Sequence, residues 1–256
     1  MSHPLFSLSG RTAMVTGSSR GLGLSIAEGL AQAGANLVLN AVDQTRLHRT
    51  AEDLRSKGYE VVEAAFDVTD EAALVAAFES LDAKGIEVDI LVNNAGIQLR
   101  KPLVDLTAAE WGKVIDTNLT SAFLVGREAA RRMIARNRGG KIINIGSLTS
   151  EAARATVGPY TAAKGGIKML TRAMAAEWAE HNIQANAIGP GYMATEMNKA
   201  LIENPSFDAW VKARTPARRW GRPEELAGTA IYLASAASDY LSGQIIYVDG
   251  GMLAVL

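Results

Sequence analysis

Three residues in the stretch SLTSEAARATVGPYTAAK, residues 147–164, carry side chains suited to proton transfer at an alcohol or a carbonyl group. Tyr160 and Lys164 are four residues apart in a predicted helix, so they share one helix face. A tyrosine with an ordinary pKa of about 10 exchanges protons poorly at neutral pH unless a cation lowers that pKa. Lys164 can supply the cation, and Ser147, at the end of a predicted strand, can hold the substrate oxygen. The spacing predicts interconversion of a secondary alcohol and a ketone, with Tyr160 as the acid–base group.

A glycine-rich segment, VTGSSRGLG, follows the first predicted strand and opens the first predicted helix. Glycines allow a sharp turn there and let the backbone approach a pyrophosphate, which the N–H groups of the helix N-terminus can bind. NNAG, residues 93–96, ends the fourth strand and would form a second wall of the same crevice, and Asp67 is placed to accept a hydrogen bond from an adenine amino group. A nicotinamide dinucleotide is therefore expected. Its predicted contacts are Gly17, Ser19, Arg20, Gly21, Leu22, Gly23, Asn40, Asp67, Val68, Asn93, Ala95, Gly96, Tyr160 and Lys164.

The charge at the end of the second predicted strand bears on which nicotinamide nucleotide binds. An acidic residue there would bind a ribose 2′-hydroxyl and repel a 2′-phosphate. Asn40 is neutral and Asp43 comes slightly late, whereas Arg20 can point toward a 2′-phosphate. The sequence favours NADP(H), with NAD(H) as the alternative.

Seven short aliphatic runs alternate with helical segments. The runs lie at 12–17, 36–41, 60–68, 89–96, 140–147, 183–191 and 244–251, and the helical segments at 21–34, 43–57, 69–84, 107–137, 159–181 and 223–237. Nearly continuous apolar runs are typical of strands buried on both faces of a parallel sheet, and the alternation predicts right-handed βαβ units. We expect a single-domain α/β fold over residues 1–256, a Rossmann-type doubly wound sheet of about seven strands with helices on both faces. The polar segment 192–222 is expected to be a helical insertion that covers the substrate.

The composition excludes several other classes of function. The chain has 256 residues, a net charge of −1, no cysteine and three scattered histidines. Disulfides and cysteine nucleophiles are thus absent, a metal site is not expected, and there is no basic field to attract nucleic acid. No apolar run reaches the roughly 18 residues of a membrane span, and the start does not resemble a signal peptide. We expect a cytoplasmic protein without a membrane partner.

These motifs together resemble the short-chain dehydrogenases/reductases over essentially the whole chain. The resemblance rests on TGSSRGLG, NNAG, Ser147, YTAAK, DTNLTSAF and PGYMATEM. It implies that Asn118 is a fourth catalytic residue, which positions a water that relays protons from Lys164. It also implies that Thr195, with the backbone after Pro190, holds the nicotinamide carboxamide. A homotetramer built from the long helices and the C-terminal strand is implied as well.

More narrowly, stretches such as NNAGIQLRKP and GSLTSEAAR are similar to gluconate 5-dehydrogenases. That resemblance implies interconversion of D-gluconate and 5-keto-D-gluconate with NADP(H) or NAD(H). The expected substrate is a small-molecule sugar acid or polyol, and a sugar acid needs a cation for its carboxylate, ideally a bidentate arginine. Arg100, after NNAG, and Arg154, in the loop before Tyr160, are the candidates. More remote cations are Lys101, Arg214 and Arg218.

Two other functions stay open from the sequence. The first is a 3-oxoacyl-carrier-protein reductase, or another keto acid or sugar reductase, on the same scaffold. A basic helix end could then meet an acidic carrier protein; it comprises Arg131, Arg132, Arg136 and Arg138. The second is a nucleotide-binding regulator without chemistry, against which the intact set of four catalytic residues argues.

Overall fold

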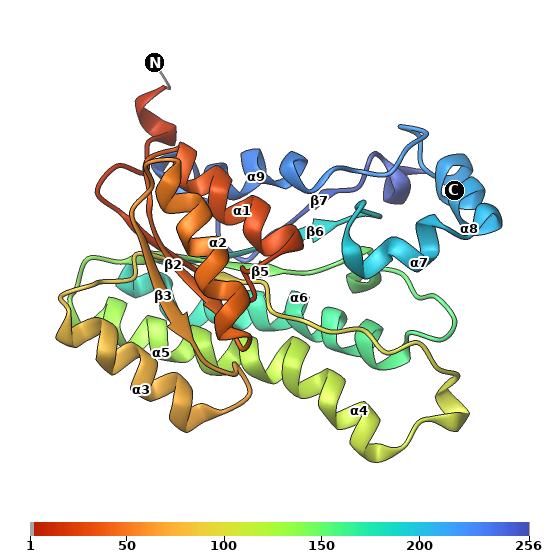
Figure 1. Ribbon diagram of the computed structural model, residues 1–256, viewed down its shortest axis with the longest axis horizontal. Coiled ribbons are helices and arrows are strands. Elements are labelled where there is room, and N and C mark those ends of the chain that lie inside the picture. The colour runs from red at the N-terminus through yellow and green to blue at the C-terminus, as the bar shows by residue number, and fades with distance from the viewer. Residues whose placement is uncertain (1–2, 256) are drawn as a thin grey trace.

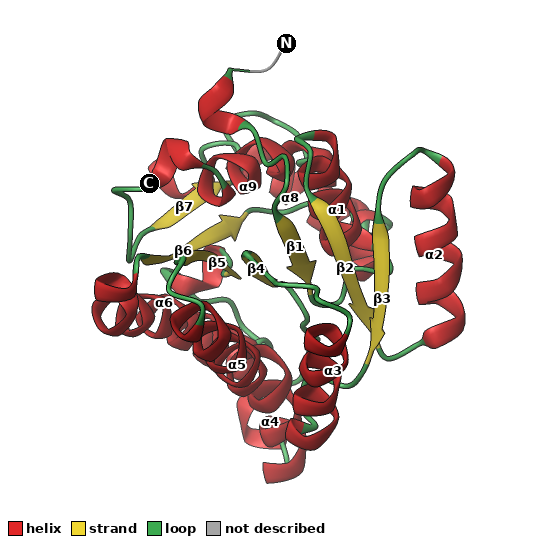
Figure 2. Ribbon diagram, turned by 90° about the vertical axis from the view of Figure 1, so that its left-hand side faces the viewer, coloured by secondary structure: helices red, strands yellow, loops and turns green. Residues whose placement is uncertain are grey.

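Seven strands form one parallel sheet (Figure 1), and Figure 2 shows their order, β3-β2-β1-β4-β5-β6-β7. This computed structural model describes residues 3–255. The strand order reverses between β1 and β4, and such a switch point opens a crevice at the carboxyl ends of the strands. The predicted doubly wound α/β fold is confirmed. The strands are β1 (Thr12–Val15), β2 (Asn36–Ala41), β3 (Val61–Ala65), β4 (Ile90–Asn93), β5 (Gly140–Ile145), β6 (Ile183–Pro190) and β7 (Ile245–Val248).

Helices cover both faces of the sheet (Figure 2). Consecutive strand residues face opposite sides, so Val15 packs in the core beneath the first group of helices while Met14 packs beneath the second. This alternation explains why the strands are apolar almost without interruption. The first group is α1 (Gly21–Gln32), α2 (Gln44–Ser56) and α9 (Ala227–Ala234), and the second is α3 (Glu71–Ala83), α4 (Ala108–Ile115), α5 (Ser121–Ala135) and α6 (Gly158–Trp178).

Side-chain caps fix where several helices begin. Asp43 accepts a hydrogen bond from the backbone N–H of Arg46 at the start of α2, and Asp70 does the same for α3. Thr107 and Glu110 form a reciprocal capping box on α4. These caps end the strand-to-helix connections close to the positions that the sequence predicts.

The region predicted as one helix over 107–137 is divided by a π-helical turn, Asp116–Thr120. Asn118 lies in this turn and is buried. Its side-chain amide donates to the carbonyls of Val114 and Ile97, at 2.8 and 2.9 Å. The bond to Ile97 crosses from the helix to the segment after β4, and π-helical turns occur frequently at functional sites.

The segment after β6 contains two further helices, α7 (Lys199–Ile202) and α8 (Pro205–Arg214), at the carboxyl end of the sheet (Figure 1). A small apolar core of Val211, Trp220 and Met252 holds this segment together. That residues 192–222 cover the substrate stays a prediction, and we call this segment the lid. No helix within residues 3–255 is long and apolar enough to cross a membrane.

Candidate active site

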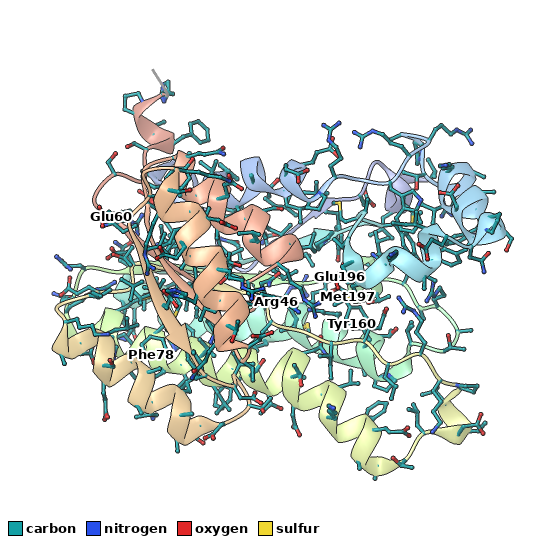
Figure 3. The ribbon with its side chains drawn as sticks, in the orientation of Figure 1. Arg46, Glu60, Phe78, Tyr160, Glu196 and Met197 are labelled. Carbon is teal, nitrogen blue, oxygen red and sulfur yellow. The ribbon has the colours of Figure 1, made fainter. Side chains whose placement is uncertain are left out.

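A cavity of about 870 Å³ opens at the carboxyl ends of the strands, between the glycine-rich turn, the loop after β5 and the lid. In Figure 3, Tyr160 lies close to Glu196 and Met197 of the lid, and Arg46 lies across from them. Both sides of the cavity therefore come from segments distant in sequence, which the sheet brings together.

The glycine-rich turn has the shape of an anion site. Gly17 and Gly21 adopt positive φ angles of 63° and 58°, which side chains disfavour. A Cβ atom on Gly23 would lie 2.5 Å from the Gly17 carbonyl oxygen. No side chain among residues 3–255 caps the N-terminus of α1, so its first N–H groups are available to an anion. These features fit the pyrophosphate of a dinucleotide.

Asn40 holds this turn in place from the end of β2. Its side chain is buried, accepts a hydrogen bond from the Gly17 N–H at 3.2 Å and donates to the carbonyls of Ala64 and Phe66. All of its amide atoms are thus engaged within the protein. Its contribution to a cofactor site is to position Gly17.

The two asparagines of NNAG face opposite ways. Asn94 donates to the carbonyls of Thr16 and Gly17 and lines the cavity. Asn93, expected in the same wall, turns into the core, where its amide donates to Asn144 Oδ1 at 2.9 Å. The reason is the alternation of side chains along a strand. Asn93 is therefore the predicted cofactor contact that lies away from the cavity, and Asn94 takes its place.

The other predicted cofactor residues lie together. They line the cavity as Gly17, Ser19, Arg20, Gly21, Leu22, Gly23, Asn40, Asp67, Val68, Ala95, Gly96, Tyr160, Lys164, Pro190 and Thr195.

Two guanidinium groups stand at one end of the cavity. Arg20 pairs with Glu196 of the lid at 2.8 Å. Arg46, in the first turn of α2, was not among the predicted contacts, and its Nε lies 3.7 Å from Asp43. The helix-capping residue Asp43 is the sequence signal that could have identified Arg46. It fixes the start of α2, so that Arg46, the third residue of the helix, lies near the end of β2. Together the two arginines can hold a ribose 2′-phosphate.

Lys164 is buried beneath Tyr160. Its Nζ donates to the Ile145 carbonyl at 2.6 Å and lies 5.5 Å from the centroid of the Tyr160 ring. Burial disfavours the charged ammonium and lowers the pKa of Lys164 from 10.5 to about 8. The group can therefore change charge close to physiological pH.

The Tyr160 hydroxyl is surrounded by groups with opposing effects on its pKa. Burial, the largest effect, raises the pKa, while a hydrogen bond with Ser147 and the charge of Arg100 lower it. Arg100 thus acts in the lowering direction, and the lowering role expected of Lys164 stays a prediction. Ser147 is fixed as well, because its Oγ accepts the Thr149 N–H at 3.1 Å.

Asn118 also lines the cavity, and its side chain is fully engaged. Besides donating to two carbonyls, its Oδ1 accepts the Ile97 N–H at 3.2 Å. A Cβ atom on Gly96 would lie 2.6 Å from that Oδ1. Asn118 thus clamps the NNAG loop against the π-helical turn, and the water that it was expected to position stays a prediction.

Arg100 and Arg154 stand at the other end of the cavity. Within residues 3–255, neither forms an ion pair with a carboxylate. Burial and the nearby charge of Arg154 lower the pKa of Arg100. Their loops are joined by a backbone hydrogen bond of 2.9 Å from Lys101 to Thr156, whose φ of 69° is unusual for a β-branched residue. Two adjacent cations that lack an acid partner can bind an anionic ligand.

The remote cations and the basic helix end are otherwise occupied. Lys101 pairs with Glu110, Arg214 donates to the Val255 carbonyl and Arg218 to that of Ala213. The arginines of the helix end pair with acids of the same chain: Arg131 with Glu128, Arg132 with Asp82 and Glu128, Arg136 with Asp89 and Arg138 with Glu87. These ion pairs largely neutralise the surface that an acidic carrier protein would need.

Comparison with known proteins places this site in a broad family of oxidoreductases. A family model described as enoyl-(acyl carrier protein) reductase matches residues 17–253. The 5-keto-D-gluconate 5-reductase of Escherichia coli strain K12 is 47% identical over 97% of this chain and 98% of its own. A crystal structure from Agrobacterium tumefaciens, provisionally called a gluconate dehydrogenase, is 67% identical, with a TM-score of 0.98 over 99% of this chain and 100% of its own. The gluconate 5-dehydrogenase of Burkholderia cenocepacia J2315, in complex with NADP and tartrate, is 47% identical, with a TM-score of 0.96 over 99% of each chain.

Proposed function

The chain belongs to the short-chain dehydrogenase/reductase family, and from this premise we propose that it interconverts D-gluconate and 5-keto-D-gluconate with NADP(H). The observation that carries the substrate is the pair Arg100 and Arg154, two cations without an acid partner within residues 3–255, in the same cavity as Tyr160. The names of the relatives support a sugar acid, and the tartrate of the Burkholderia complex is itself a hydroxy acid. NADP is supported by Arg20 and Arg46 at the opposite end of the cavity.

In the oxidative direction, Tyr160 acts as the phenolate and removes the proton of the substrate hydroxyl. Ser147 donates a hydrogen bond that holds the same oxygen, and the substrate carboxylate lies on Arg100 and Arg154. Bound NADP supplies the hydride acceptor for the carbinol carbon. Lys164 carries positive charge beside the phenolate and stabilises it, provided that its ammonium is protonated.

Steady-state kinetics of Arg100→Ala and Arg154→Ala test the proposal, with Arg49→Ala, an exposed arginine of α2, as the matched control. We expect KM for gluconate to rise at least about tenfold in each site variant, because one charge-assisted bidentate contact is removed, while the dissociation constant of NADP stays unchanged. Unchanged KM and kcat in both site variants would rule out a sugar acid held in this way.

The same assay separates the carrier-protein alternative. A β-ketoacyl thioester of an acidic carrier protein, offered beside gluconate, should be the poorer substrate, because the arginines of the helix end are held in ion pairs with the chain's own acids. Higher kcat/KM on the thioester would reverse the assignment.

We also propose that the protein is a cytoplasmic homotetramer, as expected from the sequence. Its support is a set of large apolar side chains exposed on the helices of one face, among them Trp111, Phe123 and Met169. Light scattering of the full chain and of a version truncated after Gly251 tests whether the C-terminal segment is part of the interface. A monomeric full chain would disprove the tetramer.

A further inference from the structure

Arg154 is held by aromatic side chains of the lid. Its guanidinium carbon lies 5.0 Å from the centroid of the Phe207 ring, and its Nη1 donates to the Tyr192 hydroxyl at 3.4 Å. Tyr192 lies two residues after the end of β6, whereas Phe207 lies in α8. Within residues 3–255, both the ring and the hydroxyl that contact this guanidinium therefore belong to the lid.

These two rings belong to a larger cluster. Tyr192 meets Phe207, Trp210 and Trp220 edge-on, with centroids 5.6, 5.8 and 5.6 Å apart. Trp220 is 8% exposed, and its indole N–H donates to Asp208 at 2.8 Å. Edge-on contacts of this kind are favourable and directional, so the cluster forms a fixed surface rather than a loose contact. We call these four residues the aromatic cluster.

The contact with the Phe207 ring leaves N–H groups of the guanidinium available, since Nη1 alone donates a hydrogen bond within residues 3–255, to Tyr192. A ring binds the flat face of an arginine, whereas a carboxylate binds the N–H groups along its edge. Both contacts can therefore exist at once. An arginine without an acid partner would otherwise sample many rotamers and lose that freedom on binding its ligand. Stacking on Phe207 restricts Arg154 in advance, and no carboxylate of residues 3–255 has to be displaced.

We propose that the aromatic cluster positions Arg154 for the substrate carboxylate, with Phe207 of α8 as the positioning residue. The proposal rests on the function proposed above, since it takes Arg154 as a carboxylate ligand. It adds that affinity for the substrate carboxylate depends on the lid, through the contact of the Phe207 ring with Arg154. Arg100 lies near Tyr192 but makes no cation–π contact within residues 3–255, so it should not depend on Phe207 in this way.

The test is a double-mutant cycle with Phe207→Leu and Arg154→Ala, measured as KM and kcat for gluconate and as the dissociation constant of NADP. Phe207→Leu keeps an apolar side chain and removes the ring face. We expect it to raise KM about three- to tenfold, the size of one cation–π contact at a partly exposed position, with kcat and NADP affinity within about twofold of wild type. In the Arg154→Ala background the same change should have no further effect on KM.

Two more variants distinguish loss of the contact between Phe207 and Arg154 from a general folding defect. Phe207→Tyr retains the ring face and should restore wild-type KM. Tyr240→Leu removes an exposed ring that belongs neither to the aromatic cluster nor to the cavity lining, and should leave KM within about twofold. Equal effects of Phe207→Leu in the presence and absence of Arg154, or a matching loss of NADP affinity, would overturn the positioning role.

The outcomes also separate this inference from the function on which it rests. A raised KM in Arg154→Ala together with an unchanged KM in Phe207→Leu overturns the inference alone. An unchanged KM in both Arg154→Ala and Arg100→Ala overturns the proposed carboxylate site, and the positioning role falls with it.

Discussion

Replacement of Lys164 by methionine should change how the stability of the ligand-free protein depends on pH. Burial lowers the pKa of Lys164 from 10.5 to about 8. The folded protein therefore releases this proton at lower pH than the unfolded chain does. Below about pH 8 both states carry the charge, and the folded state bears the full cost of burying it. That cost disappears as the pH rises from about 8 to about 10.5. At about 1.4 kcal/mol per pH unit, the difference corresponds to about 3 kcal/mol.

The measurement is the free energy of unfolding by urea at fixed protein concentration, between about pH 7 and pH 10.5. The wild-type value minus the Lys164→Met value should rise by about 3 kcal/mol across this range, because only the wild type relieves a buried charge. The other titrating groups are present in both proteins and cancel. The lost bond to the Ile145 carbonyl shifts the difference by a constant only. Met169→Leu, at a position 57% exposed, is the control and should give a flat difference. A flat or falling difference for Lys164→Met would refute the buried-charge reasoning.

Three further changes have expected outcomes. Tyr160→Phe should lower turnover at least about 10³-fold while NADP binds as before, because only the proton-transfer group is lost; substantial remaining activity would mean that another group is the acid–base. Glu196→Gln should tighten the binding of 2′,5′-ADP several-fold in calorimetry and leave 5′-ADP unchanged, since it releases Arg20 from its only ion pair within residues 3–255; an equal gain for both nucleotides would contradict this. Gly23→Ala should weaken NADP binding more than about tenfold because its Cβ would lie 2.5 Å from a carbonyl oxygen, whereas Gly165→Ala, with nothing within 4 Å, should not; similar affinities in both would count against the turn as the pyrophosphate site.

Hydrophobic periodicity was enough to predict the sheet and most helices, because strands buried on both faces and amphipathic helices leave distinct patterns. The π-helical turn at Asn118 left no such pattern. It is accompanied by a hydrogen bond to Ile97, 21 residues away, and a contact of that kind is set by the folded arrangement of two segments. The sequence likewise did not show whether Asn93 or Asn94 lines the cavity. Two identical residues in succession carry no signal about which one faces the cavity.

The chemistry of the site was predictable in its residue types and less so in its electrostatics. Spacing placed Tyr160 and Lys164 on one helix face, and the structure brings them together. The pKa of each group depends on how completely the fold buries it, which spacing does not convey. The effect of Arg100 on the Tyr160 pKa was likewise hidden in the sequence, because the two residues are 60 positions apart and meet only across the cavity.

The distribution of charge in the cavity links ligand binding to the state of Lys164. Arginines stand at both ends, Arg20 and Arg46 at one and Arg100 and Arg154 at the other. In the ligand-free protein, burial favours the neutral amine of Lys164 above about pH 8, and a neutral amine cannot stabilise a phenolate. An anion bound at either end adds negative charge to the cavity and raises the pKa of Lys164, so the ammonium persists to higher pH when the site is filled. A saturating dianion such as tartrate should accordingly move the pH window of the Lys164→Met stability difference upward. Just above pH 8, the ammonium of Lys164 then persists when ligand is present, whereas the amine is largely neutral when ligand is absent.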